Sequence, residues 1–308
     1  MTVSEKSLAT SGYNIGAVER NAGLSKDTLR VWERRYGFPR PIRDEHGERM
    51  YSEADVEKLR LLKRLIDRGY RPGKIVDLPS GDLRKLADTL GEAETPPALR
   101  VLIDLVKSHR ASELHAVLAQ ILVREGLERF ILDTIAPLNY HVGVAWMRGY
   151  IEVYEEHLYT EATQSLLRGA ISGIPATDRS PRVLLTTFPN EQHALGILMV
   201  QALLGGNGAA CISLGTQTPL DDIVGAAQGH EVDIVALSFS AAFSSNHLVE
   251  GLTELRARLP ARVSIWAGGG NPALTRRPIE GVSVLGRLDE VGAALETWRT
   301  LRKAEARG

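Results

Sequence analysis

The feature that most constrains the fold is a series of short apolar runs in the C-terminal part of the chain. Five runs rich in Val, Ile, Leu and Ala occupy residues 183–188, 209–215, 233–239, 263–269 and 282–287. Runs of this length are typical of strands that are buried on both faces of a parallel sheet. Stretches with helical periodicity separate most of them. This alternation predicts an α/β doubly wound, flavodoxin-like domain over residues 181–308.

The middle of the chain has no strand-like alternation. Apolar residues recur there at spacings of three and four, and the pattern breaks near His109, at Gly126 and between Gly143 and Gly149. It predicts a four-helix bundle over residues 99–174. A stretch rich in Pro, Gly, Ser and acidic residues precedes the bundle, and we expect a linker that carries a short helix over residues 81–98. A second linker is expected over residues 175–180.

Residues 1–80 contain a helix-turn-helix pattern. Asn14 precedes a short helix, and Ser25 precedes a second helix that stops at Gly37. Asn and Ser are favoured N-cap residues, and a short turn that contains Gly joins the two helices of this motif. A polar stretch follows, with a His-Gly pair at the tip of an expected hairpin. Ser52 then begins a third helix.

The composition excludes several classes of protein. The chain has 308 residues, a formal net charge of -1 and 24% charged residues, as in ordinary globular proteins. One cysteine, Cys211, excludes a disulfide scaffold, and neither a signal peptide nor a membrane span is visible. We therefore expect a cytoplasmic protein without membrane contact. Residues 1–80 hold 16 basic and 12 acidic side chains against 21 and 26 in the remainder, which favours a polyanion as partner of the N-terminal part.

The second helix predicts a basic surface. Leu29 and Trp32 fall on its inward face, together with the preceding Leu24. The outward face presents Lys26, Thr28, Arg30, Glu33, Arg34 and Arg35. Arg is well suited to bidentate contacts with guanine or phosphate. Spacing alone leaves open that this is only the solvated face of an amphipathic helix.

The residues of this region carry a more specific signal. The run L-R-x-W-E-R-R-Y-G, followed by P-x-R, G-x-R-x-Y-S and D-V, resembles the MerR family of winged-helix transcription regulators. The resemblance implies a winged helix-turn-helix head that binds double-stranded promoter DNA as a dimer or higher oligomer. It implies that the second helix faces DNA and that the loop from Arg43 to Tyr51 forms the wing. The predicted DNA-binding residues are Lys26, Thr28, Arg30, Arg34, Arg43, Arg49 and Tyr51.

A second motif follows the first apolar run of the C-terminal domain. Glu191, His193 and Gly196 form E-x-H-x-x-G where a strand leads into a helix. Ligands of doubly wound sheets bind outside the carboxyl ends of the strands, so His193 would face a ligand there. Glu191 would hold its other ring nitrogen, as carboxylates do for metal-binding imidazoles. For the motif alone, a surface histidine at a helix start is the alternative.

Two further positions belong with this motif. Ser238 ends the third strand, and Gly268-Gly269-Gly270 ends the fourth, where glycines leave room for a flat ring. Together the positions resemble the cobalamin-binding pattern D-x-H-x-x-G, S-x-L and G-G. The resemblance implies that His193 coordinates cobalt from below and that Ser238 and the glycines accommodate the nucleotide tail. The chain departs twice: Glu191 replaces Asp, and Ser240 replaces Leu, which we expect to loosen the fit around the tail.

The helical segment carries the spacing W-x9-E-H, formed by Trp146, Glu156 and His157. On one unbroken helix the first and last of these would lie roughly 16 Å apart, whereas a break at Gly149 would bring them together. A core tryptophan with two solvated polar residues is the alternative. The whole arrangement resembles the CarH/LitR class of adenosylcobalamin-dependent repressors, which includes light sensors. The resemblance implies that Trp146 covers the adenosyl group and that Glu156 and His157 hold it.

Position 147 departs from that class, because its light-sensing members carry a histidine where this chain has Met147, and a thioether binds cobalt(III) poorly. We predict adenosylcobalamin as the cofactor and His193 as the metal ligand. The predicted cofactor-binding residues are Trp146, Met147, Glu156, His157, Glu191, His193, Gly196, Ser238, Ser240, Gly268 and Gly269.

The sequence thus predicts a homo-oligomeric transcription regulator, a repressor, rather than an enzyme. A bound corrinoid would control its oligomerisation, as dimer or tetramer, and its affinity for DNA, with light as a candidate signal. Two other functions stay open. The C-terminal domains could respond to a different effector, such as another tetrapyrrole or small molecule, or serve as a corrinoid carrier in methyl transfer.

Overall fold

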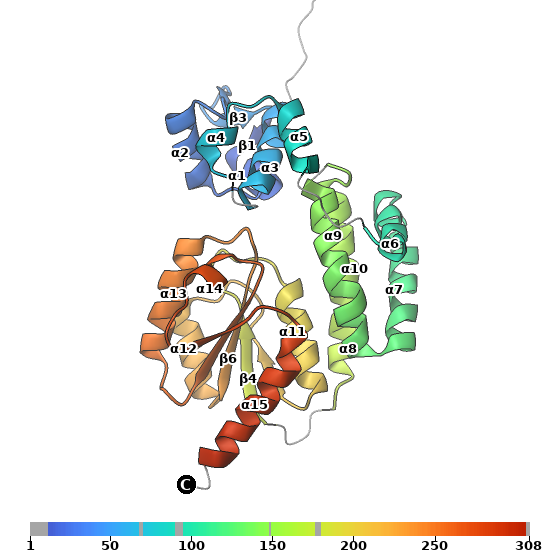
Figure 1. The fold of residues 1–308 in the computed structure, drawn as a ribbon, viewed down its shortest axis with the longest axis vertical. Helices are drawn as coiled ribbons and strands as arrows, with labels where there is room; N and C mark the ends of the chain where they lie inside the picture. The colour runs from blue at the N-terminus through green and yellow to red at the C-terminus, as the bar shows by residue number, and fades with distance from the viewer. Residues whose placement is uncertain (1–11, 68–69, 90–94, 148, 176–179, 306–308) are drawn as a thin grey trace, which may run out of the picture. The chain divides into compact units, whose positions relative to one another are not determined.

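The computed structural model describes residues 12–67, 70–89, 95–147, 149–175 and 180–305 (Figure 1). It separates into two compact units. Unit 1 comprises Met1–Pro96 and Val142–Val153, and unit 2 comprises Pro97–His141 and Tyr154–Gly308. The helical segment predicted as one domain is therefore divided, since the end of one helix and the connection to the next belong to unit 1.

Unit 1 begins with the predicted helix-turn-helix. Helices α1 (Ile15–Ala22) and α2 (Lys26–Tyr36) are both capped as the sequence predicts. The Asn14 side chain accepts a hydrogen bond from the backbone N–H of Ala17 at 2.8 Å, and Ser25 Oγ accepts one from the N–H of Thr28 at 3.2 Å. Gly23, with a φ of 63°, ends α1 in the left-handed conformation that glycine adopts at little cost. These local signals fix the turn between the two helices.

A small antiparallel sheet accompanies the two helices. Strands β1 (Tyr13–Asn14), β3 (Arg49–Tyr51) and β2 (Ile42–Arg43) lie in that order. The β2–β3 hairpin closes with a hydrogen bond from Asp44 N–H to Glu48 O at 3.0 Å, and Gly47 has a φ of 77°. The hairpin therefore lies where the polar stretch predicted one.

The remaining helices of unit 1 complete its core. They are α3 (Glu53–Asp67), α4 (Pro72–Ile75) and α5 (Ser80–Thr89). Leu29 and Trp32 of α2 pack in one cluster with residues of α1 and α3, as predicted. Leu83 of α5 is fully buried in the same cluster. The first part of the expected linker is thus a packed element of the head, because an apolar side chain anchors it to α3.

The described residues from 97 to 172 are helical except at short breaks. The helices are α6 (Pro97–Lys107), α7 (Ala111–Glu125), α8 (Leu127–Arg129), the π-helix η1 (Phe130–Ile135), α9 (Ala136–Met147) and α10 (Val153–Ser172). The breaks fall where the sequence predicts them, at residues with positive φ: His109, Gly126 and Gly149. Because α8, η1 and α9 run on without interruption, the segment consists of four helical rods.

Unit 2 contains the predicted parallel sheet. Its strands are β4 (Arg182–Thr186), β5 (Ala210–Ser213), β6 (Ile234–Phe239), β7 (Ser264–Gly269) and β8 (Val282–Leu285). They pair in the order β5-β4-β6-β7-β8, and every pairing is parallel. The doubly wound Rossmann-like fold of this part is therefore confirmed.

Helices cover both faces of the sheet. Helices α12 (Leu220–Gly229) and α13 (Ser245–Arg258) lie on one face, and α11 (Leu195–Gly206) and α15 (Glu290–Glu305) lie on the other, with the short α14 (Ala273–Arg276) after β7 (Figure 1). The connections run in opposite directions from β4 and β6, so their carboxyl ends flank a switch point, where such folds bind ligands. In the described part of the chain, no helix is long and apolar enough to cross a membrane.

Candidate functional site

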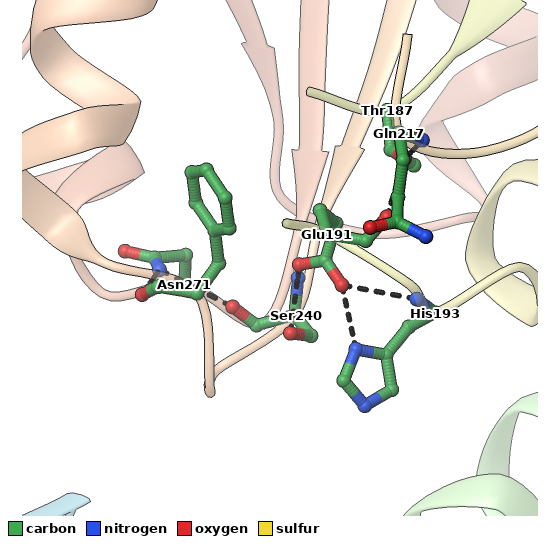
Figure 2. A network of polar contacts seen from close by, with 7 residues as sticks. Thr187, Glu191, His193, Gln217, Ser240 and Asn271 are labelled. Carbon is green, nitrogen blue, oxygen red and sulfur yellow. Dashed lines mark hydrogen bonds and ion pairs between the residues drawn. The ribbon is translucent and has the colours of Figure 1, made fainter. Parts of the chain in front are cut away.

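The loop after β4 is fixed at the switch point by hydrogen bonds from its own threonine. Thr187 Oγ1 donates to the backbone carbonyl of Glu191 at 2.6 Å and accepts from the N–H of Gln217 at 2.8 Å. Asn190 turns the chain with a φ of 70°. Figure 2 shows how this loop brings Glu191 and His193 beside the residue that follows β6, Ser240.

The carboxylate of Glu191 is the centre of the site. The residue is only 1% exposed. One oxygen, Oε1, accepts from the N–H of His193 at 3.1 Å and lies 2.6 Å from its ring Nδ1. The other, Oε2, accepts from the N–H and the hydroxyl of Ser240 at 2.7 and 2.8 Å. Burial would raise the pKa of Glu191, but the hydrogen bonds from His193 and Ser240 outweigh it and hold the pKa below its usual range.

Ser240 is itself held in place by the loop after β7. Asn271, which is 2% exposed, donates from Nδ2 to the carbonyls of Ser240 and Phe243 at 3.2 and 2.8 Å. The sequence interpretation treated Ser240 as a departure that loosens the site. Its position instead makes it the partner of Glu191, a role that the sequence pattern did not reveal.

The imidazole of His193 is oriented by this network. Its side chain is 65% exposed, with the Nδ1 edge facing Glu191 and the Nε2 edge pointing away from the network (Figure 2). The hydrogen bond with Glu191 raises the pKa of His193; burial opposes this, and the charges of Glu191 and of Glu156 on α10 add to the rise. Glu156 therefore lies close enough to act on the same ring. An imidazole fixed through Nδ1 offers Nε2 as a metal ligand.

The glycines of the motif serve the backbone of the sheet. A Cβ at Gly196 would lie 2.4 Å from Ser238 Oγ, so the start of α11 approaches the end of β6 closely. A Cβ at Gly268 would lie 2.9 Å from the carbonyl oxygen of Leu285, and Gly269, with a φ of 113°, would place one 2.2 Å from that of Phe239. Both glycines were predicted to make room for a ligand. The structure shows a second reason for glycine at both positions, because a side chain there would collide with the backbone of a neighbouring strand.

The predicted residues of the helical segment fall in both units. Glu156 accepts from Thr160 Oγ1 at 2.6 Å and contacts His157 Nδ1 at 2.8 Å, so the two members of the E-H pair bind each other on α10. Trp146 belongs to unit 1. Met147 is the last residue of α9, and its side chain lies outside the described residues.

Four of the predicted DNA-binding side chains are exposed: Lys26, Arg30, Arg34 and Arg43. Arg30 Nη1 lies 3.2 Å from the carboxylate of Asp27, and Arg43 Nη1 donates to the carbonyl of Gly47 at 2.6 Å. Thr28 is half-buried and its hydroxyl lies 2.9 Å from Ser25 Oγ. Helix α2 and the β2–β3 hairpin thus both carry exposed arginines.

The remaining DNA candidates, Arg49 and Tyr51, are joined to each other through Glu33. Tyr51 is 1% exposed and donates from its hydroxyl to Glu33 at 2.6 Å, while Arg49 Nε donates to the other oxygen of that carboxylate at 3.1 Å. Burial, followed by the contact with Glu33, raises the pKa of Tyr51. The expectations that Tyr51 contacts DNA and that Glu33 faces outward therefore do not match the structure. The two residues join α2 to β3, because a buried phenol needs an acceptor.

Three protein families match successive parts of the chain. Residues 13–80 match the family described as "MerR HTH family regulatory protein". Residues 98–168 and 181–292 match two families that are each described as "B12 binding domain". The second of these includes the site around His193.

Curated relatives match most of the chain. The "HTH-type transcriptional repressor CarH" of Myxococcus xanthus is 28% identical over 85% of this chain and 90% of its own length. The "HTH-type transcriptional repressor CarA" of the same organism is 29% identical over 95% of this chain and 98% of its own.

A solved structure is similar in fold. The Methanosarcina barkeri monomethylamine corrinoid protein covers 64% of this chain and 96% of its own, with a TM-score of 0.52 and 18% identity. That likeness concerns the fold alone. The family matches and the two repressors bear on function, since they span both the head and the helical and sheet domains. The chain is therefore a MerR-type transcription regulator, not an enzyme, in which a helix-turn-helix domain is followed by two B12-binding domains.

Proposed function

We propose that the chain binds cobalamin through His193 and uses the bound cofactor to control its affinity for promoter DNA, as a repressor. The observation that carries the proposal is the buried carboxylate of Glu191. Ser240 takes one of its oxygens, so the other remains for Nδ1 of His193. A ring that donates from Nδ1 presents a basic Nε2 to a metal.

The other predicted cofactor-binding residues have side chains that suit a large flat cofactor. Gly196 lets the start of α11 lie close to the Ser238 hydroxyl, which a Cβ would overlap at 2.4 Å. Glu156 and His157 supply polar groups from α10, and Trp146 supplies an aromatic face from α9. Bound cobalamin would supply a cobalt centre that accepts an imidazole nitrogen and, in its adenosyl form, a light-sensitive cobalt–carbon bond. The chain's own residues orient the ring of His193 and contact the cofactor.

The N-terminal head is the DNA-binding part of the proposal. Helix α2 would enter the major groove with Arg30 and Arg34, and the β2–β3 hairpin would serve as a wing with Arg43. MerR-type heads of this kind fit two-fold-related sites as pairs, so the chain would act as a dimer or tetramer. The four helical rods would pack as a bundle that covers the cofactor.

The proposal is tested with the full chain. Protein is incubated with hydroxocobalamin or adenosylcobalamin in the dark, freed from excess cofactor and examined by visible spectroscopy and by binding to its own promoter region. We expect retained cobalamin with an altered spectrum and a promoter Kd that depends on loading. His193→Ala should retain less cobalamin and lose the spectral change. His230→Ala changes an exposed histidine just after α12 and is the matched control. Equal retention and equal spectra in the His193 variant would place the cofactor elsewhere.

Light is the finer part of the proposal. Met147 offers a weaker cobalt ligand than histidine, so a light-driven change in oligomeric state should reverse more readily in this chain. The test compares wild type and Met147→His, each loaded with adenosylcobalamin, illuminated and followed by spectrum and size-exclusion chromatography. The change should persist longer in Met147→His. Irreversible disassembly of wild type would contradict the proposed role of Met147, and no response in either protein would favour a sensor of cofactor level.

A further inference from the structure

Trp146 has a partner in the DNA-binding head. The guanidinium carbon of Arg60, on α3, lies 5.6 Å from the centre of the indole ring, within the range of a cation–π interaction. Both residues belong to unit 1. The indole Nε1 is buried and has no hydrogen-bond partner among the described residues. Arg60 therefore holds the face of an indole whose one polar atom is unsatisfied in this state.

The same guanidinium is bound to the helix-turn-helix. Arg60 Nε donates to the backbone carbonyl of Asn21 at 3.0 Å, and Nη2 donates to its side-chain oxygen at 3.0 Å. Asn21 lies in the last turn of α1 and donates from Nδ2 to the carbonyl of Ala17 at 2.8 Å. Gly23 and the cap of the recognition helix, Ser25, follow directly. One arginine thus connects Trp146 to the end of α1, where the chain turns into α2.

We propose that Arg60 is a positioning residue that transmits the state of Trp146 to the recognition helix. The inference rests on the proposed function, in which Trp146 contacts the cofactor. A cofactor that engages the indole competes with Arg60 for the same side chain. When Arg60 leaves the indole, its hydrogen bonds with Asn21 change. The conformation at the end of α1 therefore differs between the protein with and without bound cofactor. By linkage, cofactor binding and DNA binding then alter each other by the same factor.

The experiment measures that factor in the full chain. Promoter Kd is determined with and without bound hydroxocobalamin for wild type, Arg60→Ala and Asn21→Ala. Allosteric factors of this kind are typically about 5- to 150-fold. We expect the ratio of the two Kd values to fall to near one in both variants, while each still retains cobalamin with the wild-type spectrum. Lys58→Ala is the matched control, because Lys58 lies on the same helix with its Nζ 4.6 Å from the ring centre of Phe38, and it should keep the full ratio.

A second readout separates transmission from a structural role. The ¹⁵N–¹H signal of the Trp146 indole, assigned with Trp146→Phe, should shift in wild type when cobalamin is added. In Asn21→Ala that shift should persist although the effect on DNA is lost, since Arg60 still faces the ring. Arg60→Lys keeps the charge but cannot bind both Asn21 oxygens through a planar fork, so it should not restore the ratio. This variant decides the question if Arg60→Ala does not fold.

The outcomes are distinct. A full ratio in Arg60→Ala, or in Arg60→Lys if the alanine variant does not fold, overturns the role of Arg60 and leaves the proposed function intact. A ratio near one in wild type that retains cobalamin overturns cofactor control of DNA binding and the inference with it. Loss of cobalamin retention in Asn21→Ala would contradict the claim that this residue acts only on the DNA side.

Discussion

Ser240 donates two hydrogen bonds to a single oxygen of Glu191, from its backbone N–H at 2.7 Å and from its hydroxyl at 2.8 Å. This relationship assigns the two carboxylate oxygens to different partners, because the other oxygen faces His193. The longer side chain of Glu191, compared with the Asp of the cobalamin-binding pattern, and the serine in place of Leu thus occur together in one contact. The two departures from the pattern are interpreted best as a matched pair.

Ser240→Ala removes the hydroxyl but keeps the backbone hydrogen bond. We expect cobalamin affinity to fall by about 10-fold, since loss of a partner behind a metal ligand typically costs 10- to 100-fold. Ser240→Leu should cost at least as much, because an apolar side chain cannot donate to the buried carboxylate. Equilibrium titration followed by visible absorbance measures both. In a His193→Ala background, Ser240→Ala should have no further effect; an undiminished effect there would show that the serine acts independently of the histidine.

Gly269→Ala tests the part that glycines play in the sheet. A Cβ at this position meets the carbonyl oxygen of Phe239 at 2.2 Å with a φ of 113°. The substitution should lower the free energy of unfolding by roughly 1–3 kcal/mol. Gly225→Ala in α12, where nothing lies within 4 Å of the new Cβ, should instead raise it by about 0.5–1 kcal/mol. Urea titration measures both, and a loss of the same size in both variants would contradict the proposed contact.

Two of the exposed arginines of the head, Arg30 and Arg43, should contribute to DNA binding in different ways. Arg30→Ala should cost about 1–3 kcal/mol at the cognate site and relax base preference, as expected for a side chain that reads a base. Arg43→Ala, in the hairpin, should weaken all sequences about equally and lower the salt slope by about one. Binding to operator variants over a range of salt concentrations separates them. Unchanged binding in both variants would be incompatible with the proposed interface.

His141 gives the helical B12-binding domain, residues 98–168, a pH dependence. Burial lowers the pKa of this imidazole below its ordinary value of 6.5. As the pH falls below about 6.5, the imidazole binds a proton more readily in the unfolded chain than in the folded one. The contribution of neutral His141 to the free energy of unfolding is therefore complete above about pH 6.5 and is lost as the pH falls below it. Thermal unfolding between pH 7.5 and 5 should therefore show a smaller loss of Tm in His141→Gln than in wild type. His115→Gln, at an exposed position of α7, is the control and should keep the wild-type slope.

Much of the fold follows from local sequence signals. The caps Asn14 and Ser25 and the breaks at Gly126 and Gly149 act within a few residues, and the apolar runs define all five strands of the parallel sheet to within one or two residues at each end. Propensity and periodicity are sufficient where the partners are neighbours in sequence.

The side-chain contacts that the sequence did not predict join residues that are distant in sequence. Ser240 and Glu191 are 49 residues apart, and Tyr51 and Glu33 are 18 apart. Arg60 reaches Asn21 across 39 residues. For Ser240, Tyr51 and Glu33 the sequence pattern suggested another role, and for Arg60 it suggested none, because only the tertiary fold supplies the partner. Helix α5 was likewise assigned to a linker by its composition, since a single buried leucine carries little weight against many Pro, Gly and Ser residues.

Unit 1 is assembled from two separated stretches of sequence, Met1–Pro96 and Val142–Val153. A chimera that exchanges heads at a single crossover near residue 96 would give the incoming head a foreign segment around Trp146. Three crossovers, near residues 96, 142 and 153, would be needed to transfer the head together with its own partner for Arg60. New operator specificity in a chain built this way is therefore more accessible through substitutions within α2 than through recombination of whole heads.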